Sequence, residues 1–168
     1  MESHYKYSFD ETTSTYNFTT TNNIFYKVAF VIDHTFSSIA NQQISKVFQL
    51  VIEKVNIEIE PFDIKVSKTI EVIIESFFIN VENSLVFLCY DQNNKGKLRY
   101  EVFERWYNKS VAKQNITKIN KIFEFNIDKN EVQKFYTAFI FHNKNPNYVM
   151  LISIYNSIAD VLNTVKEQ

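Results

Sequence analysis

The sequence predicts one α+β (or mixed α/β) domain that combines an N-terminal antiparallel meander, a mixed central sheet and about three helices. Three patterns support this fold class. Apolar and polar residues alternate through the first third of the chain, a helical periodicity follows Pro61, and an unbroken apolar run at residues 85–90 precedes a second helical stretch. With 168 residues and 45% hydrophobic content, residues 1–168 are expected to fold as a single domain.

The alternation at the start of the chain predicts the meander. Aromatic and aliphatic residues occupy every second position in residues 5–9, 16–18 and 26–30. Because successive side chains of a strand point to opposite faces, this pattern is typical of antiparallel strands with one solvated face. The polar residues 21–23 are expected to form a tight turn between two of these strands.

A second strand system is expected from about Val47 to Ile59, where apolar and polar residues alternate until Pro61 ends the pattern. The helix that follows is expected to take Asp63 or Ser67 as its N-cap, since both side chains accept hydrogen bonds from the first turn. Its apolar face is predicted from the spacing of six residues, namely Val66, Ile70, Ile73, Ile74, Phe77 and Val81.

The run from Leu85 to Tyr90 has the unbroken apolar character of a central strand that is covered on both faces. A loop over residues 91–97 and a second helix from about Leu98 to Ser110 are expected next. Two alternating strands, residues 123–127 and 135–141, are then expected to form a hairpin.

The last part of the sequence leaves one element open. Residues 148–155 fit either a buried strand or the start of a helix. Ser157 and Asp160 have the spacing of a capping box, with Asp in place of the usual Glu or Gln, and they predict that a short amphipathic helix begins there.

Composition excludes several function classes. The net charge of −1 gives no field that favours nucleic acid or an anionic membrane, and no segment has the length of a membrane span. The three histidines have no metal-ligand spacing, and a single glycine cannot build a glycine-rich phosphate loop, so neither a metal nor a cofactor is predicted. The lone cysteine and the absence of a secretory signal favour a soluble, cytoplasmic protein.

One short window, Cys89 to Trp106, holds residue types that are rare elsewhere in the chain. It contains the only cysteine, the only glycine (Gly96), the only tryptophan and both arginines, whereas the other 16 of the 18 basic residues are lysine. An arginine that survives in a lysine-rich chain is expected to serve a role that needs its planar fork. This window is therefore the candidate site, with Asp91, Asn93, Gly96, Arg99, Arg105 and Trp106 as candidate binding residues and no catalytic residue assigned.

The start of the window has a partial likeness to a calcium-binding loop. Asp91, Asn93 and Gly96 occupy the first, third and sixth positions of such a loop. Lys95 stands at the fifth position and Val102 at the twelfth, where a bidentate glutamate is required. The favoured interpretation is a strand-to-helix loop in which Gly96 adopts a positive φ.

The two arginines have different interpretations. Glu101 precedes Arg105 by four residues, so a helical ion pair worth about 0.2–0.5 kcal/mol accounts for Arg105. Arg99 has no acid at that spacing. It is expected either to pair with Asp91 and join strand to helix, or to point into a crevice at the carboxyl end of the strand and hold a phosphate or carboxylate.

Two further residues of the window have an apolar setting. Trp106 is interpreted as a core anchor, with a stacking platform for a ligand as the alternative. Cys89 lies inside the apolar strand and is interpreted as a buried, inert thiol.

The order strand, helix, strand, helix, hairpin from about Val47 to Phe141 resembles the second half of the GNAT-type acetyltransferase fold. In that family a glycine-rich loop at the start of the first helix binds the pyrophosphate of coenzyme A. The corresponding residues here are Asp63-Ile64-Lys65-Val66-Ser67, which contain no glycine. The resemblance therefore implies a degenerate version that does not transfer acetyl groups.

A second pattern covers most of the chain and resembles a small uncharacterised bacterial family, which implies a shared fold without supplying an activity. It consists of Tyr16-Asn17-Phe18-Thr19-Thr20, Tyr26-Lys27-Val28-Ala29-Phe30, Thr69-Ile70, Phe77-Phe78, Cys89-Tyr90-Asp91, Gly96, Arg99, Phe103 and Trp106.

These observations favour a non-enzymatic module of a bacterial cell or its phage, which binds either a protein partner or a small anionic ligand. The alternative is a small transferase or hydrolase, with Arg99 as anion anchor and Asp91 as acid or base. Exposed strand edges would also allow a homodimer to form through the sheet.

Overall fold

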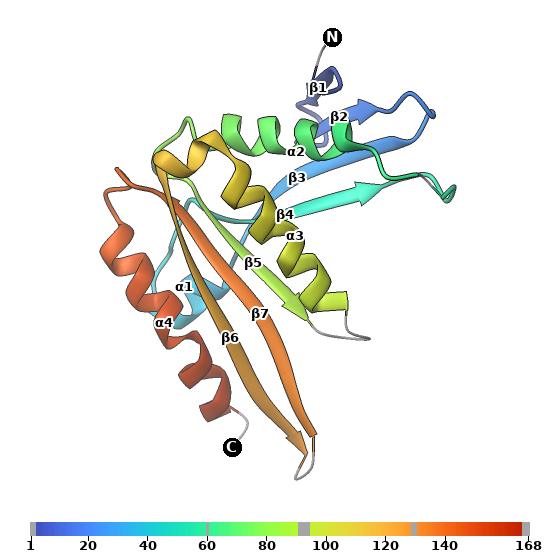
Figure 1. Ribbon diagram of the computed structural model, residues 1–168. Helices are drawn as coiled ribbons and strands as arrows, with labels where there is room; N and C mark the ends of the chain where they lie inside the picture. Colours follow the sequence, from blue (N-terminus) through green and yellow to red (C-terminus); the bar gives the residue numbers. More distant parts are fainter. Residues whose placement is uncertain (1–2, 60, 91–94, 129–130, 166–168) are drawn as a thin grey trace.

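The structure, a computed structural model, describes residues 3–59, 61–90, 95–128 and 131–165. Within them one mixed sheet of seven strands has the order β1-β2-β3-β4-β5-β7-β6, and helices cover both faces (Figure 1). The fold is α+β, as the sequence predicted. The strands are β1 (Tyr7–Asp10), β2 (Thr15–Thr19), β3 (Phe25–Ile32), β4 (Val47–Lys54), β5 (Ser84–Tyr90), β6 (Ile116–Asp128) and β7 (Glu131–His142).

The meander is confirmed as the antiparallel strands β1 to β4. Its turns rely on polar residues that tolerate the left-handed region, because the chain offers almost no glycine. Ser14 (φ 54°) lies between β1 and β2, and Asn23 (φ 59°) lies in the predicted turn between β2 and β3. Phe18 and Val28 are buried on the face that the alternation assigned to the core.

The expected extension of β4 to Ile59 is wrong, since the strand ends at Lys54. The physical reason is the length of its neighbour. β3 begins at Phe25, whose carbonyl accepts a backbone hydrogen bond from Val55 at 2.9 Å. Among the described residues, no strand lies in position to pair with the chain that follows Val55. Ile57 and Ile59 consequently stand 97% and 95% exposed.

Helix α2 (Ile64–Phe77) has Asp63 as its N-cap, which was one of the two residues predicted. The Asp63 carboxylate accepts a hydrogen bond of 2.8 Å from the backbone N–H of Lys65. Ile73, Ile74 and Phe77 are buried against the sheet. The helix ends at Phe77 rather than reaching Val81.

The unbroken apolar run forms the central strand β5, as predicted. β5 is parallel to β4 and antiparallel to β7, with which it pairs along its whole length. Helix α3 (Lys95–Lys109) follows and begins three residues before the expected start at Leu98. A short 3-10 helix, η2 (Val111–Gln114), leads into the β6–β7 hairpin, which extends the two predicted strands.

The final segment is one helix, α4 (Tyr148–Val165), so the open choice for residues 148–155 resolves as helix. Ser157 lies inside α4 and donates to the Ile154 carbonyl at 2.8 Å, so a capping box at Ser157 is wrong. Helix α1 (Thr35–Ala40) was not predicted. Its six residues are too few for a helical periodicity to be recognised.

The helices divide between the two faces of the sheet. Helices α1 and α4 cover one face, where Phe36, Phe139 and Tyr155 are fully buried. Helices α2 and α3 cover the other face, where they pack against Leu85 and Phe87 of β5 and against β7. None of the helices among the described residues has both the length and the apolar character that a membrane crossing requires.

The N-cap of α2 can be tested by substitution. Asp63→Ala is expected to lower the free energy of unfolding by about 1 kcal/mol, because the first turn loses its hydrogen-bond acceptor. Urea denaturation measures the change, and Asp63→Asn serves as the matched control because it retains a capping oxygen. Equal destabilisation by both variants would contradict the capping role.

Candidate functional site

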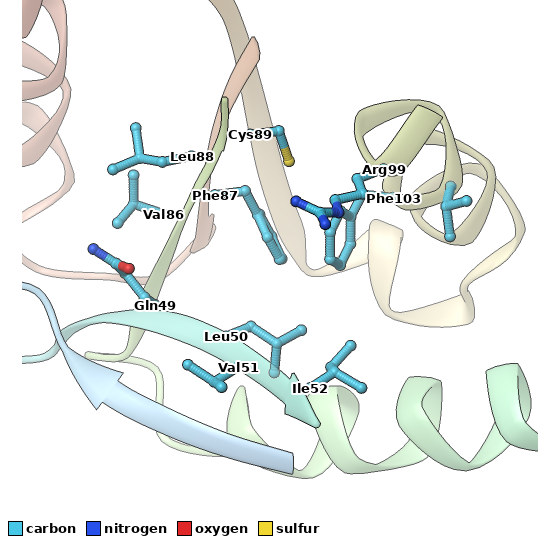
Figure 2. A pocket seen from close by; sticks show the side chains of 11 residues that line it. Gln49, Leu50, Val51, Ile52, Val86, Phe87, Leu88, Cys89, Arg99 and Phe103 are labelled. Atoms are coloured by element: carbon cyan, nitrogen blue, oxygen red, sulfur yellow. The ribbon is translucent and has the colours of Figure 1, made fainter. Parts of the chain in front are cut away.

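The parallel pair β4–β5 opens into a cleft. Only three residue pairs are in register, and the last of them joins Gln49 to Val86. Beyond that point β4 stays with β3 as far as Lys54, while β5 stays with β7 as far as Tyr90. The space between them is a cavity of about 480 Å³ (Figure 2). It is lined by Gln49, Leu50, Val51, Ile52, Val86, Phe87, Leu88, Cys89, Arg99, Val102 and Phe103.

Two strand edges face this cleft. In the described part of the chain, no strand pairs with β4 beyond Gln49 on the side away from β3. Likewise, no strand pairs with β5 beyond Val86 on the side away from β7. Backbone donors and acceptors on such edges are available to another extended molecule. The cleft therefore combines apolar side walls with polar backbone edges.

The two strands that flank the cleft, β4 and β5, carry apolar side chains on both faces of the sheet. Figure 2 shows Val86 and Leu88 on one side of β5, and Phe87 and Cys89 on the other side, which faces α3. Leu88 and Val51 remain 44% and 45% exposed. An extended ligand, whose own substituents alternate, would meet apolar surface on each side.

Helix α3 supplies the third wall and its charge. Phe103 packs on Phe87 with the ring centroids 4.1 Å apart, which places the N-terminal half of the helix over β5. Arg99 projects from this half toward the side of β5 that carries Phe87 and Cys89 (Figure 2). Burial raises the pKa of the Cys89 thiol, and the charge of Arg99 opposes that rise. The thiol is thus a protonated, weakly reactive group near neutral pH.

The predicted site residues do not all line the cleft. Arg99 lines the cleft, as its crevice interpretation predicts. Asp91 and Asn93 lie outside the described residues, so the pairing of Asp91 with Arg99 stays a prediction. The positive φ expected for Gly96 is wrong. The helix already begins at Lys95, so Gly96 is a buried residue of the first turn.

Arg105 and Trp106 lie away from the cleft lining. Arg105 is exposed, and the predicted partner Glu101 has its carboxylate 3.9 Å from Lys97 Nζ. No ion pair of Arg105 exists among the described residues. Trp106 packs against the core beneath α2 and α3, as the core-anchor interpretation predicts. Its indole N–H is buried without a hydrogen-bond partner in the described residues.

A buried ion pair, missed from the sequence, fixes the position of α3. The side chain of Lys118 in β6 is 2% exposed and contacts the Glu104 carboxylate, which is 28% exposed and also accepts a 2.6 Å hydrogen bond from Asn120. The Lys118 ammonium lies 5.3 Å from the ring centroid of Tyr100 and 5.5 Å from that of Tyr107. Burial lowers the pKa of Lys118 to about 8, although the carboxylate favours the charged form.

Lys118 could not be recognised because the predicted strand began only at residue 123. Extended back to Ile116, the strand places Lys118 on the same face as that buried residue, and a lysine in such a position is unusual. A lysine at a position that the strand alternation assigns to the buried face is therefore the sequence signal that would have identified Lys118. The pair ties α3 to β6 and so holds Arg99 over the cleft.

A second hollow lies at the N-terminus of α2, where the acetyltransferase resemblance would place a pyrophosphate. It has a volume of about 360 Å³ and is lined partly by Tyr5, Asp63 and Lys65. The Asp63 carboxylate accepts hydrogen bonds from the Lys65 N–H and from the Tyr5 hydroxyl. A carboxylate already satisfies the first turn, so this helix end is a poor place for another anion.

The family of unknown function DUF6169 matches residues 62–157, which is more than half of the chain. The matched segment includes α2, β5, α3 and the β6–β7 hairpin, and therefore two of the three walls of the cleft. No curated protein and no solved structure matches the chain.

The proximity of Arg99 to Cys89 can be tested through thiol reactivity. Iodoacetamide is expected to alkylate Cys89 more slowly at pH 8 than it alkylates a free cysteine peptide, because the raised pKa lowers the thiolate fraction. The rate should rise with pH. Arg99→Gln should slow the reaction further, while Arg105→Gln should leave it unchanged. The same rate in both variants would show that Arg99 does not act on the thiol.

The buried ion pair can be tested by removing each partner. Glu104→Gln is expected to lower the free energy of unfolding by about 1–3 kcal/mol, because Lys118 then keeps a buried charge without a counter-ion. Lys118→Met should be neutral or stabilising, because it removes the charge and retains the apolar stem. Urea denaturation measures both, with Glu101→Gln, at a half-exposed glutamate of the same helix, as control. A Lys118→Met variant as unstable as Glu104→Gln would contradict this account.

Proposed function

We propose that this chain, which belongs to the DUF6169 family of unknown function, is a non-enzymatic module that binds a small, elongated, anionic ligand in the β4–β5 cleft. One observation carries the proposal. The parallel strands separate after three residue pairs and leave two unpaired edges around an apolar cavity, with Arg99 beside it. Apolar cavities of several hundred Å³ with a few polar groups are the usual form of small-molecule sites.

The strand edges select the shape of the ligand. An extended chain that carries amide or similar groups can hydrogen-bond to β4 between Leu50 and Lys54, and to β5 between Phe87 and Tyr90. Its apolar parts would contact Val51 and Leu88 on one face of the sheet and Phe87 on the other. A compact ligand would leave these backbone groups unsatisfied.

Arg99 selects the charge. Its guanidinium presents a planar fork that matches a carboxylate or a phosphate, and lysine does not reproduce that geometry. Lysine is the usual basic residue of this chain, so an arginine on the cleft wall supports a bidentate contact. The position of the fork over β5 is held by the packing of Phe103 on Phe87 and by the buried Lys118–Glu104 pair.

The ligand class differs from that of an active acetyltransferase. The order of β4, α2, β5, α3 and the hairpin is similar to the second half of the GNAT-type fold, in which coenzyme A binds through its pyrophosphate at the first helix. Here Asp63 occupies that helix end. The proposed ligand is therefore held by the cleft and by Arg99, without a pyrophosphate at α2, and no acetyl transfer is proposed.

A small transferase or hydrolase remains the second candidate, because Arg99 lies near the carboxyl end of β5 and Asp91 directly follows that strand in sequence. In that case Asp91 would act as acid or base on a ligand anchored by Arg99. Turnover that disappears in Asp91→Asn while binding persists would identify the enzyme.

Ligand binding can be tested by a thermal-shift screen with pantothenate, phosphopantetheine, N-acetylated dipeptides and short fatty acids. A ligand present at about 100 times its Kd stabilises the native state by about 2.7 kcal/mol, which corresponds to a rise in Tm of roughly 5–10 °C. Arg99→Lys should abolish the shift, and Arg105→Lys should retain it. Equal shifts in both variants would remove Arg99 from the site.

A further inference from the structure

A glutamine side chain lies at the closed end of the cleft, where β4 and β5 still pair. Gln49 belongs to the last residue pair of the parallel contact and lines the cavity. Its Nε2 donates a hydrogen bond of 2.5 Å to the Asp33 carboxylate, so the amide oxygen points away from that residue. No donor among the described residues reaches this oxygen. The closed end therefore offers a hydrogen-bond acceptor to a ligand.

The Asp33 carboxylate behind Gln49 is buried. It is 2% exposed and accepts a second hydrogen bond of 2.9 Å from the backbone N–H of Thr35. None of the ion pairs in the described part of the chain includes it. Buried carboxylates are normally paired with a positive charge. The closed end of the cleft thus favours a cationic group that donates a hydrogen bond.

The open end of the cleft, where the strands have diverged, carries the opposite charge. Arg99 lines this end and acts electrostatically on Cys89. Gln49 is in register with Val86, and Cys89 follows three residues later, so about 10 Å of strand separates the two ends. Figure 2 shows Gln49 and Arg99 on opposite sides of β5. A ligand that lies between the strands, in the plane of the sheet, passes between them.

We infer that the ligand of this cleft is a short peptide of about three residues with free termini, its amino group at Gln49 and its carboxylate at Arg99. Three extended residues span at most about 10 Å, which matches the separation of the two ends. The inference rests on the proposed function and names the chemical class of its ligand. The peptide carboxylate is the anionic group that this function requires.

The peptide would run parallel to both neighbouring strands. β4 and β5 share one direction, from their paired residues Gln49 and Val86 toward the open end. A peptide whose amino group lies at the closed end takes the same direction, and parallel strands exchange evenly spaced backbone hydrogen bonds. The unpaired edges of β4 and β5 offer donors and acceptors on either side of it. An acyl chain could not use these backbone groups.

The side chains of the peptide would meet apolar surface on both faces of the sheet, because successive side chains of an extended chain point to opposite sides. Val51 and Leu88 lie on one face. Phe87 lies on the other face, together with Val102 of α3, which is 51% exposed. Arg99 is the one charged residue that lines the cavity within the described part of the chain. Peptides with apolar side chains are therefore expected to bind best.

Isothermal titration calorimetry of the full chain with the tripeptide Leu-Ala-Leu tests the inference. The N-acetylated tripeptide lacks the ammonium group, and the tripeptide amide lacks the carboxylate. Each should bind at least about 10-fold more weakly, because a hydrogen bond to a charged group is lost at one end. The pentapeptide Leu-Ala-Leu-Ala-Leu should also bind more weakly than the tripeptide, because its termini are too far apart to reach both groups.

Substitutions assign each end of the peptide. Gln49→Leu should remove the preference for the free peptide over the acetylated one. Asp33→Asn should reduce that preference, since it removes the charge and keeps a side-chain oxygen for the N–H of Thr35. Arg99→Gln should remove the preference for the carboxylate over the amide. Gln43→Leu, at an exposed glutamine, is the control and should retain both preferences. Circular dichroism verifies that each variant is folded.

Equal affinities for the free and acetylated tripeptides, or no binding of either, would overturn the inference. The thermal-shift screen separates this failure from a failure of the proposed function. If another ligand of the screen still gives a shift that depends on Arg99, the proposed function stands and only the peptide assignment is wrong. If no ligand depends on Arg99, both are wrong.

Discussion

The separation of β4 from β5 depends on the way the two halves of the sheet are tied to different helices. Phe77 of α2 stacks on Phe30 of β3 and meets Phe48 of β4 edge-on, with centroid distances of 4.0 and 5.2 Å. Phe103 of α3 packs on Phe87 of β5. Both helices contribute to one apolar cluster, but among the described residues the backbone pairing between the two halves of the sheet is limited to the short parallel contact that ends at Gln49.

The rare residues of the window from Cys89 to Trp106 do not all lie at the cleft. Arg99 and Arg105 are both exposed, but Arg99 lines the cleft, whereas Arg105, six residues later on α3, does not. Trp106 belongs to the packing under the helix. The position of Arg99 thus depends on contacts made elsewhere along α3, among them the hydrogen bond from the Tyr107 hydroxyl to the Ile116 carbonyl at 3.2 Å.

The divergence has a second consequence at the outer end of β4. A strand that leaves one neighbour early must end, bend or find another partner, because its backbone groups otherwise face only water. β4 ends soon after β3 runs out, and the apolar residues beyond it stay exposed. The cleft and the exposed segment are therefore two results of the same arrangement of strands.

Local pattern was enough to predict the meander, an N-cap at Asp63 or Ser67 and the central strand at residues 85–90. Each of these depends on periodicity or on a side chain acting on its own backbone. The end of β4 at Lys54, the helical φ of Gly96, the Lys118–Glu104 pair and the cleft itself were decided by tertiary structure. They depend on where neighbouring strands stop and on which helix packs over which strand, and contacts between residues far apart in sequence leave no periodic signal.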